Sequence, residues 1–330
     1  MIVVEGVSKF YGRSPAVRDL SFRIAEGECV GFLGLNGAGK STTLRLLSCL
    51  LLPTSGSIRV GGFDAERQPH EIRKLIGYLP DSPPLYPEMR VDEYLRFAGR
   101  LRRMTGAELE KRLPRVLEQT GLTRVADAAI ETLSHGYKQR VGIAQAVIHA
   151  PKLLILDEPV QGLDPVQIVE MRQLIRSLRG AHTILLSSHL LSEIERTCDR
   201  ILILKEGRLV ASGTEEEVVE QMSARPASSR DAARLHWAIA EVRGTEEQVR
   251  AALAAADLTI VELRSTAGGI CRVKIESGSD SRERVAARIV GAGLGLLTLT
   301  RSQSALEDVF VALTAPGGEA PAARAAEVDA

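Results

Sequence analysis

The chain has 330 residues, of which 45% are hydrophobic, and its 42 basic and 42 acidic residues give a net charge of +0. This length and composition predict one large domain or two ordinary ones with a sizeable core, and they exclude wholesale disorder. The balanced charge and an aromatic content of only 4% argue against a nucleic-acid partner, which would favour a basic surface and base-stacking side chains.

The first two thirds of the chain, residues 1–222, have the pattern of a mixed α/β domain. Apolar and polar residues alternate over 21–24 and 56–60, which predicts antiparallel strands. The runs 153–156 and 183–186 are continuously apolar, which is typical of strands buried on both faces of a parallel sheet.

Helical periodicity lies between these strands. Apolar residues recur at helical spacing over 91–104, 107–120, 137–149 and 166–178. The first three of these segments predict a helical subdomain at about 82–150 within the larger domain.

A second, smaller domain is predicted after a change of composition. Residues 223–234 are rich in Ser, Ala, Arg and Pro and predict a linker. Residues 235–314 then predict an α+β domain of the split βαβ type, and the Ala-, Pro- and Gly-rich tail 315–330 is expected to be disordered. The predicted strands are 235–242, 258–263, 270–275 and 294–300, and the predicted helices are 246–255, 282–290 and 306–313.

The cysteines and the apolar runs argue against zinc-binding, disulfide-linked and membrane-spanning proteins. The four cysteines are far apart and form no C-x-x-C pair, so they predict neither a zinc site nor a disulfide framework. We expect them to be core residues in a reducing cytosol. The amino terminus lacks the layout of a signal peptide, and no apolar run approaches the roughly 20 residues of a membrane span.

A phosphate-binding motif carries most of the functional signal. Residues 34–41 read Gly34-Leu35-Asn36-Gly37-Ala38-Gly39-Lys40-Ser41 and fit the P-loop pattern G-x-x-x-x-G-K-[ST], between an apolar strand (29–33) and a helical run (42–47). The glycines let backbone amides face phosphate oxygens, and the helix start adds unpaired N–H groups. We expect Lys40 to reach the β- and γ-phosphates of a bound nucleotide and Ser41 to bind Mg²⁺. The predicted nucleotide contacts here are Gly34, Asn36, Gly37, Ala38, Gly39, Lys40, Ser41 and Thr42.

Two acids end the apolar strand 153–156. Asp157 and Glu158 would lie at its carboxyl end, where ligands bind in open α/β sheets. Asp157 suits the Mg²⁺ shell, directly or through water. Glu158 could polarise an attacking water.

The segments around these motifs resemble the ATP-binding-cassette (ABC) ATPases, the motor subunits of transporters. Leu133-Ser134-His135-Gly136-Tyr137-Lys138-Gln139-Arg140-Val141 resembles the signature of that family, which usually reads Leu-Ser-Gly-Gly-Gln. Gly162-Leu163-Asp164-Pro165 resembles the D-loop, His189 the switch histidine and Tyr11 the aromatic residue that stacks on adenine. The resemblance covers about residues 1–220, in the order of the family.

The resemblance implies an ATP-dependent homodimer. In the family, the signature of one subunit closes on the γ-phosphate of ATP bound to the other, so Ser134 and Gly136 would contact that nucleotide. Asp164 of the D-loop is also expected to bind nucleotide. His189 would contact the γ-phosphate and hold the water or Glu158. Taken alone, His189 is more simply a helix-cap histidine and Tyr11 a strand aromatic.

Two departures from the family pattern stand out. His135 and Tyr137 replace the usual Gly and Gln of the signature, although Ser134 and Gly136 remain. Asp81, in Ile76-Gly77-Tyr78-Leu79-Pro80-Asp81, occupies the place of the Q-loop glutamine. Since a carboxylate can meet Mg²⁺ through water, we expect Asp81 to sense the metal.

The branch of the family and its partner follow from local matches. Residues 77–81 with Leu85-Tyr86, and Ser304 to Thr314, resemble ABC-2-type exporters and gliding-motility-associated ATP-binding subunits. The resemblance implies a cytoplasmic subunit, peripheral on the inner face of the membrane through a permease. We expect the permease to dock near Pro83, Pro84, Leu85, Tyr86 and Pro87; the alternative is a loop that merely turns the chain.

Other classes of function remain possible from the sequence. One is a soluble ABC ATPase that acts on ribosomes or DNA, which the single cassette, the absence of sustained heptads and the balanced charge disfavour. Another is a nucleotide-binding regulator without catalysis, which the presence of Lys40, Asp157, Glu158 and His189 disfavours. The sequence leaves open the cargo, the direction of transport, the identity of the permease and the role of the small second domain.

Overall fold

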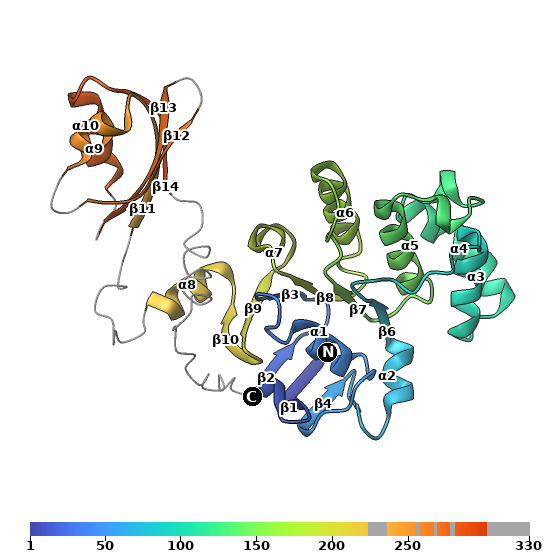
Figure 1. Ribbon diagram of the computed structural model, residues 1–330. Coiled ribbons are helices and arrows are strands. Elements are labelled where there is room, and N and C mark those ends of the chain that lie inside the picture. Colours follow the sequence, from blue (N-terminus) through green and yellow to red (C-terminus); the bar gives the residue numbers. More distant parts are fainter. Residues whose placement is uncertain (224–235, 255–257, 267–268, 278–280, 302–330) are drawn as a thin grey trace. The chain divides into compact units, whose positions relative to one another are not determined.

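The computed structural model describes residues 1–223, 236–254, 258–266, 269–277 and 281–301 (Figure 1). Its internal contacts divide the chain into one unit that contains Met1–Glu215 and a second that begins at Glu216. The predicted linker after residue 223, the predicted helix 306–313 and the predicted tail 315–330 lie outside the described residues.

An antiparallel sheet opens the first unit. Strand β1 (Ile2–Tyr11) lies between β2 (Ser14–Ile24) and β4 (Ser55–Val60), and β5 (Phe63–Asp64) is at the edge next to β4. Both antiparallel strands predicted from alternation therefore exist, as parts of β2 and β4. They do not pair with each other, because β1 separates them.

A six-stranded sheet forms the centre of the first unit, in the order β10-β9-β3-β8-β7-β6. Its strands are β3 (Cys29–Leu33), β6 (Ile76–Leu79), β7 (Leu153–Asp157), β8 (Thr183–Ser188), β9 (Arg200–Lys205) and β10 (Arg208–Gly213). All neighbours are parallel except β10, which is antiparallel to β9. Every residue of β3, β7 and β8 is buried, as the continuously apolar runs predict. The mixed α/β fold class is thus confirmed.

The helices of the first unit are α1 (Lys40–Leu47), α2 (Pro69–Leu75), α3 (Val91–Leu101), α4 (Gly106–Gln119), α5 (His135–Val147), α6 (Pro165–Ser177) and α7 (Leu191–Thr197), with 3-10 turns η1 (Thr123–Val125) and η2 (Ile130–Thr132). Helix α8 (Glu215–Ser223) starts at the last residue of the segment Met1–Glu215 and otherwise belongs to the second unit. The predicted helix boundaries agree to within three residues. Helices α3, α4 and α5 gather beside β6 (Figure 1). Among the described residues, no helix combines the length and the apolar character needed to cross a membrane.

Helix α5 lies unusually close to the sheet edge. A Cβ atom added to Gly77 on β6 would lie 2.1 Å from the carbonyl oxygen of Ala146 on α5, and one added to Gly142 would lie 2.5 Å from a methyl group of Leu79. The side-chain amide of Gln145 also donates to a β6 carbonyl over 2.8 Å. At Gly77 the backbones of α5 and β6 are thus in direct contact, which only glycine allows, while Gly142 makes room for the side chain of Leu79.

The second unit is a four-stranded antiparallel sheet in the order β12-β13-β11-β14 with two helices on one face (Figure 1). Its elements are β11 (His236–Arg243), α9 (Glu246–Leu253), β12 (Thr259–Thr266), β13 (Ile270–Ser277), α10 (Arg282–Gly291) and β14 (Gly295–Arg301). Strand β13 lies between β11 and β12, which is the split βαβ arrangement expected from the sequence. The helices bury Val249 and Val285 against its core.

Candidate functional site

The P-loop cleft lies at the carboxyl edge of the parallel sheet, where the chain passes from β3 to α1. Its volume is about 460 Å³. The cleft is lined by Ala16, Leu35, Asn36, Gly37, Ala38, Gly39, Lys40, Ser41, Thr42, Asp81, Glu158, Gln161 and His189. The structure therefore brings most of the predicted P-loop residues together with Asp81, Glu158 and His189. Gly34 is buried beside the cleft and does not line it.

Close packing explains two glycines of the loop. A Cβ atom on Gly39, whose φ is +99°, would lie 2.6 Å from the carbonyl oxygen of Ala16. One on Gly34 would lie 2.6 Å from the carbonyl oxygen of Leu204. The loop is thus held against β2 and β9, and any larger residue at these positions would force it out of place.

Lys40 is buried in the cleft and its ammonium group has three partners. Its Nζ donates to the carbonyl oxygens of Gly34, at 2.6 Å, and Leu35, at 3.4 Å. It also lies 3.3 Å from Oε1 of Glu158, whose side chain is equally buried. A buried charge with these partners is compensated, and it is held where a phosphate of a bound nucleotide could replace them.

Asp157 ends β7 beside the P-loop. Its Oδ1 accepts hydrogen bonds from Ser187, at 2.7 Å, and from Ser41, at 3.2 Å. Burial raises the pKa of this carboxyl group most strongly, while the two hydroxyls lower it and the nearby charges of Asp81 and Glu158 raise it further. A cation at this position would offset both the burial and the like charges.

The donor set suits Mg²⁺ that is bound together with nucleotide phosphates. Ser41 and Asp157 supply hard oxygen atoms, and Asp81 faces the same cleft. No three His, Cys, Asp or Glu side chains within the described ranges converge on one metal position. Magnesium in NTPases needs no such cluster, because phosphates and water complete its shell.

Glu158 is held in an unusual conformation at the other side of Lys40. Its φ is +48°, which non-glycine residues rarely adopt, and its backbone N–H donates to Oγ of Ser187 over 2.9 Å. Nδ1 of His189 lies 2.9 Å from Oε2, and the carboxylate accepts from the imidazole. Strain of this kind is common at functional sites, and here it turns the carboxylate into the cleft.

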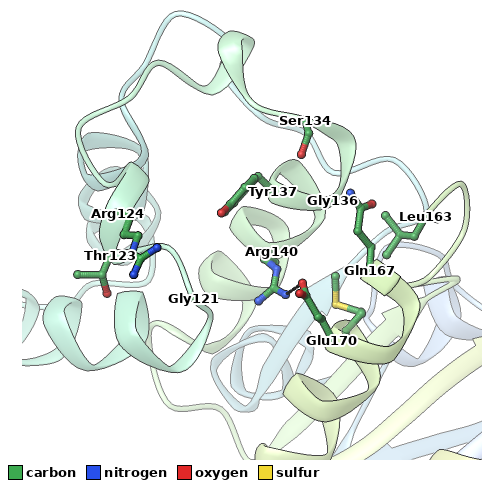
Figure 2. A pocket seen from close by; sticks show the side chains of 11 residues that line it. Gly121, Thr123, Arg124, Ser134, Gly136, Tyr137, Arg140, Leu163, Gln167 and Glu170 are labelled. Atoms are coloured by element: carbon green, nitrogen blue, oxygen red, sulfur yellow. Dashed lines mark hydrogen bonds and ion pairs between the residues drawn. The ribbon is translucent and has the colours of Figure 1, made fainter. Parts of the chain in front are cut away.

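A second cleft, of about 410 Å³, lies at the start of α5, and we call it the signature cleft. It is lined by Gly121, Thr123, Arg124, Ser134, Gly136, Tyr137, Arg140, Leu163, Gln167, Glu170 and Met171. Figure 2 shows these side chains around the opening, with Arg140 joined to Glu170 by an ion pair of 2.7 Å.

The start of α5 has an open cap. Ser134 is its N-cap residue, but its exposed side chain makes no capping hydrogen bond. Gly136 is buried, and a Cβ atom there would lie 2.8 Å from Oε1 of Gln167. The two clefts share no lining residue, so a single chain does not bring Ser134 and Gly136 to its own P-loop.

Two other predicted residues lie outside both clefts. Asp164 caps α6 by accepting from the backbone N–H groups of Val166, at 3.0 Å, and Gln167, at 2.9 Å. Tyr11 is half exposed at the end of β1, with Nζ of Lys9 5.8 Å from its ring centre. Their roles at the nucleotide stay predictions.

Sequence reasoning misses two residues that line the P-loop cleft and one residue, Ser187, that contacts Asp157 and Glu158. Ser187 directly follows the apolar run 183–186 in β8; its hydroxyl donates to Asp157 and accepts from the backbone N–H of Glu158. Ala16 and Gln161 line the cleft from β2 and from the loop after β7. The serine could have been found as the one hydroxyl pair, Ser187-Ser188, that ends an otherwise apolar strand before His189.

Comparisons with known proteins give the family. The model of the family described as "ABC transporter" matches residues 17–161. The bacitracin transport ATP-binding protein BcrA of Bacillus licheniformis is 34% identical over 319 residues, which cover 96% of this chain and 98% of BcrA. The Nod factor export ATP-binding protein I of Rhizobium meliloti (strain 1021) is 41% identical over 222 residues, which cover 67% of this chain and 66% of that protein.

Solved structures agree with this assignment. The dimeric structure of a post-hydrolysis state of the ATP-binding cassette MJ0796, bound to ADP and Pi, is 28% identical with a TM-score of 0.60, and the match covers 65% of this chain and 98% of that one. The P-loop, the acidic end of β7 and the full-length relative agree on one assignment. The chain belongs to the ABC transporter family, as an ATP-binding subunit that hydrolyses ATP.

Proposed function

We propose that this chain is the motor subunit of an ABC-2-type exporter, which dimerises around two ATP molecules and drives a separate transmembrane permease. The proposal rests above all on Glu158, which is buried between Lys40 and His189 in the P-loop cleft. A carboxylate in this position can serve as the general base for attack of water on a γ-phosphate.

The nucleotide would bind along the P-loop. Its backbone amides and the start of α1 favour phosphate groups. Lys40 would leave its present partners for the β- and γ-phosphates, which offer stronger charge-assisted hydrogen bonds than carbonyl oxygens. Ser41 and Asp157 would hold Mg²⁺, which supplies charge neutralisation between the phosphates. Asp81 would reach that shell through water.

Hydrolysis would follow from the geometry around Glu158. Once Lys40 turns to the phosphates, one carboxylate oxygen is free to accept the proton of a water molecule. His189 would keep the other oxygen oriented through its 2.9 Å contact and would face the γ-phosphate with its second ring nitrogen. This arrangement would position the reactants without further movement of the sheet.

Dimerisation is proposed because a complete nucleotide site would need the P-loop of one chain and the signature residues of another. The open cap at Ser134 and the first-turn amides of α5 form an anion-binding helix start. This helix start does not reach the P-loop of the same chain. A head-to-tail pair of chains would bring the helix start of one chain to the P-loop of the other. The dimeric MJ0796 cassette supports this proposal by analogy. Asp164 and Tyr11 would then contact the nucleotide from the interface and the adenine side.

The permease would dock on the loop between β6 and α3. Pro84, Tyr86 and Pro87 are exposed, while Pro83 and Leu85 are half buried. The ring of Tyr86 packs against Phe97 of α3, with ring centres 5.5 Å apart. The loop therefore presents an apolar surface that is packed against α3. Export as the direction is supported by the name of the Nod factor relative, and the cargo remains unassigned.

Affinity purification from native membranes tests the proposal. The Glu158→Gln variant would be captured with Mg-ATP, which should keep the closed dimer because binding is retained while turnover stops. Recovery of a multi-span membrane protein is the expected result. A Lys40→Ala form of the same variant, which should not bind ATP tightly, is the control. Recovery of ribosomes or DNA with no membrane protein would overturn the proposal and favour a soluble ABC ATPase.

A further inference from the structure

His135, the first residue of α5, makes a contact that joins the two clefts. Its Nε2 lies 3.0 Å from the carbonyl oxygen of Gln161. A carbonyl oxygen can only accept, so the imidazole must donate through Nε2–H. His135 is flanked by Ser134 and Gly136 of the signature cleft, whereas Gln161 lines the P-loop cleft.

Gln161 belongs to the short loop that carries Glu158. Its backbone N–H donates to the carbonyl oxygen of Glu158 over 3.1 Å, which closes a turn directly after the carboxylate. The loop ends at Asp164, which caps α6. A displacement of Gln161 therefore acts on the backbone of Glu158, three residues away, whose left-handed conformation leaves little freedom.

The contact is sterically close as well as hydrogen-bonded. A Cβ atom on Gly162, whose φ is +73°, would lie 3.2 Å from Nε2 of His135. At the next residue of α5, a Cβ atom on Gly136 would lie 2.8 Å from Oε1 of Gln167 on α6. The start of α5 thus rests on the loop after β7 and on α6 at two neighbouring points.

We propose that His135 is a positioning residue that couples the two clefts of one chain. When an anion settles on the start of α5, the imidazole would transmit the change to the carbonyl oxygen of Gln161 and so to Glu158. The signature cleft of a subunit would thereby set the reactivity of that subunit's own P-loop cleft. This inference rests on the proposed function, since it assumes that a phosphate of the partner's ATP occupies the signature cleft.

Steady-state ATP hydrolysis by the full chain, with its permease where one is recovered, tests the coupling. His135→Ala removes the donor, and the loss of one such hydrogen bond should lower kcat roughly three- to tenfold. KM for ATP should change little, and the Hill coefficient should fall toward one. His135→Gln places an amide N–H at a similar reach and should restore most of the rate.

Lys138→Ala is the matched control. Lys138 lies in the same turn of α5 and donates to a backbone carbonyl over 3.2 Å, but that carbonyl belongs to Glu131, outside the loop after β7. It should behave as the wild type. If His135→Ala keeps the wild-type kcat and Hill coefficient, or if Lys138→Ala is impaired as much, the inference is wrong. Failure of His135→Gln to restore the rate would also overturn it.

A binding measurement separates this inference from the proposed function. In the Glu158→Gln background, Mg-ATP should slow hydrogen exchange at the amides of residues 159–163, and His135→Ala should abolish that effect without weakening nucleotide binding. If the wild type fails to hydrolyse ATP, the proposed function fails, while the exchange result still decides whether His135 couples the clefts. Unchanged protection in His135→Ala would refute the coupling.

Discussion

The two clefts of the first unit differ in how completely the chain satisfies them. In the P-loop cleft, Lys40, Glu158 and His189 all have partners from the same chain, as does Asp157 beside it. In the signature cleft, the hydroxyl of Ser134 and the start of α5 have no capping partner. The first is organised before any ligand arrives, and the second depends on a group from outside.

This difference suits the P-loop cleft to binding and the signature cleft to switching. A preorganised site loses little free energy when its ligand binds, because its charges already have fixed positions. An open helix start contributes only when an anion reaches it, so it suits a role that must switch. The following predictions test whether the two clefts divide binding and switching in this way.

The largest effect is expected at the organised cleft. Glu158→Gln removes the proposed general base but keeps the size of the side chain, so kcat for ATP hydrolysis should fall by about 100-fold or more. Affinity for ATP, measured by equilibrium titration, should stay within about threefold of the wild type, because no phosphate contact is lost. Retained steady-state turnover would show that Glu158 is not the base.

A slightly smaller effect is expected at the open cleft. Gly136→Asp would place a carboxylate at the start of α5, where it would repel a phosphate and collide with Gln167. Dimer formation with Mg-ATP in the Glu158→Gln background should weaken by about 100-fold in sedimentation or light scattering, since like charges at an interface cost several kcal/mol. ATP binding by the monomer should not change. Normal dimerisation of the Gly136→Asp variant would contradict the proposed role of the signature cleft in switching.

The raised pKa of Asp157 predicts a dependence of stability on pH. Its folded-state pKa lies above its unfolded value, so the folded state binds more protons and the stability from this group is lost as pH rises through that raised pKa. Asp157→Asn removes the charge and keeps an acceptor for Ser41 and Ser187. Its Tm without nucleotide should exceed that of the wild type by roughly 2–4 °C at neutral pH.

The gain in Asp157→Asn should vanish in acid, where the carboxyl group is protonated in both states. Mg-ATP should stabilise this variant less than the wild type, because a ligand of the cation is gone. Scanning fluorimetry over a pH series, with and without Mg-ATP, measures both effects. A gain that persists unchanged at low pH would contradict the electrostatic explanation.

The smallest effect is expected at Asp81, which is exposed at the mouth of the P-loop cleft. Asp81→Asn should reduce the apparent affinity for Mg²⁺ in ATP hydrolysis by about two- to threefold, since an exposed charge acts through solvent. Coupling of turnover to the permease should fall in parallel. If both quantities are unchanged, Asp81 has no part in sensing the metal.

Much of this organisation can be predicted from the sequence because its signals are local. The P-loop spacing, the apolar runs of β7 and β8, and the alternation in parts of β2 and β4 each depend on neighbouring residues. Strand β6 escapes prediction because it has only four residues, one of them a glycine, which is too short a pattern to be read as a strand. The family resemblance is shown by the comparisons, and it was visible in the motifs.

The contacts of His135 and Ser187 could not be predicted, because they depend on tertiary placement. Nothing in the spacing of His135 and Gln161, 26 residues apart, indicates that they touch. Ser187 is hidden in the same way, since its hydroxyl contacts residues from another strand. Such contacts arise only when α5, β7 and β8 take their places around the sheet.

The close packing of α5 on β6 has a mechanical consequence. The side chain of Pro83, at the start of the proposed docking loop, would lie 3.0 Å from a Cβ atom on Gly142, so loop, strand and helix leave no room for a side chain at this position. A displacement of the loop would therefore be transmitted to α5. A larger residue at Gly77 or Gly142 would separate α5 from β6 or from the loop. A movement of a membrane partner would then be transmitted less effectively to α5.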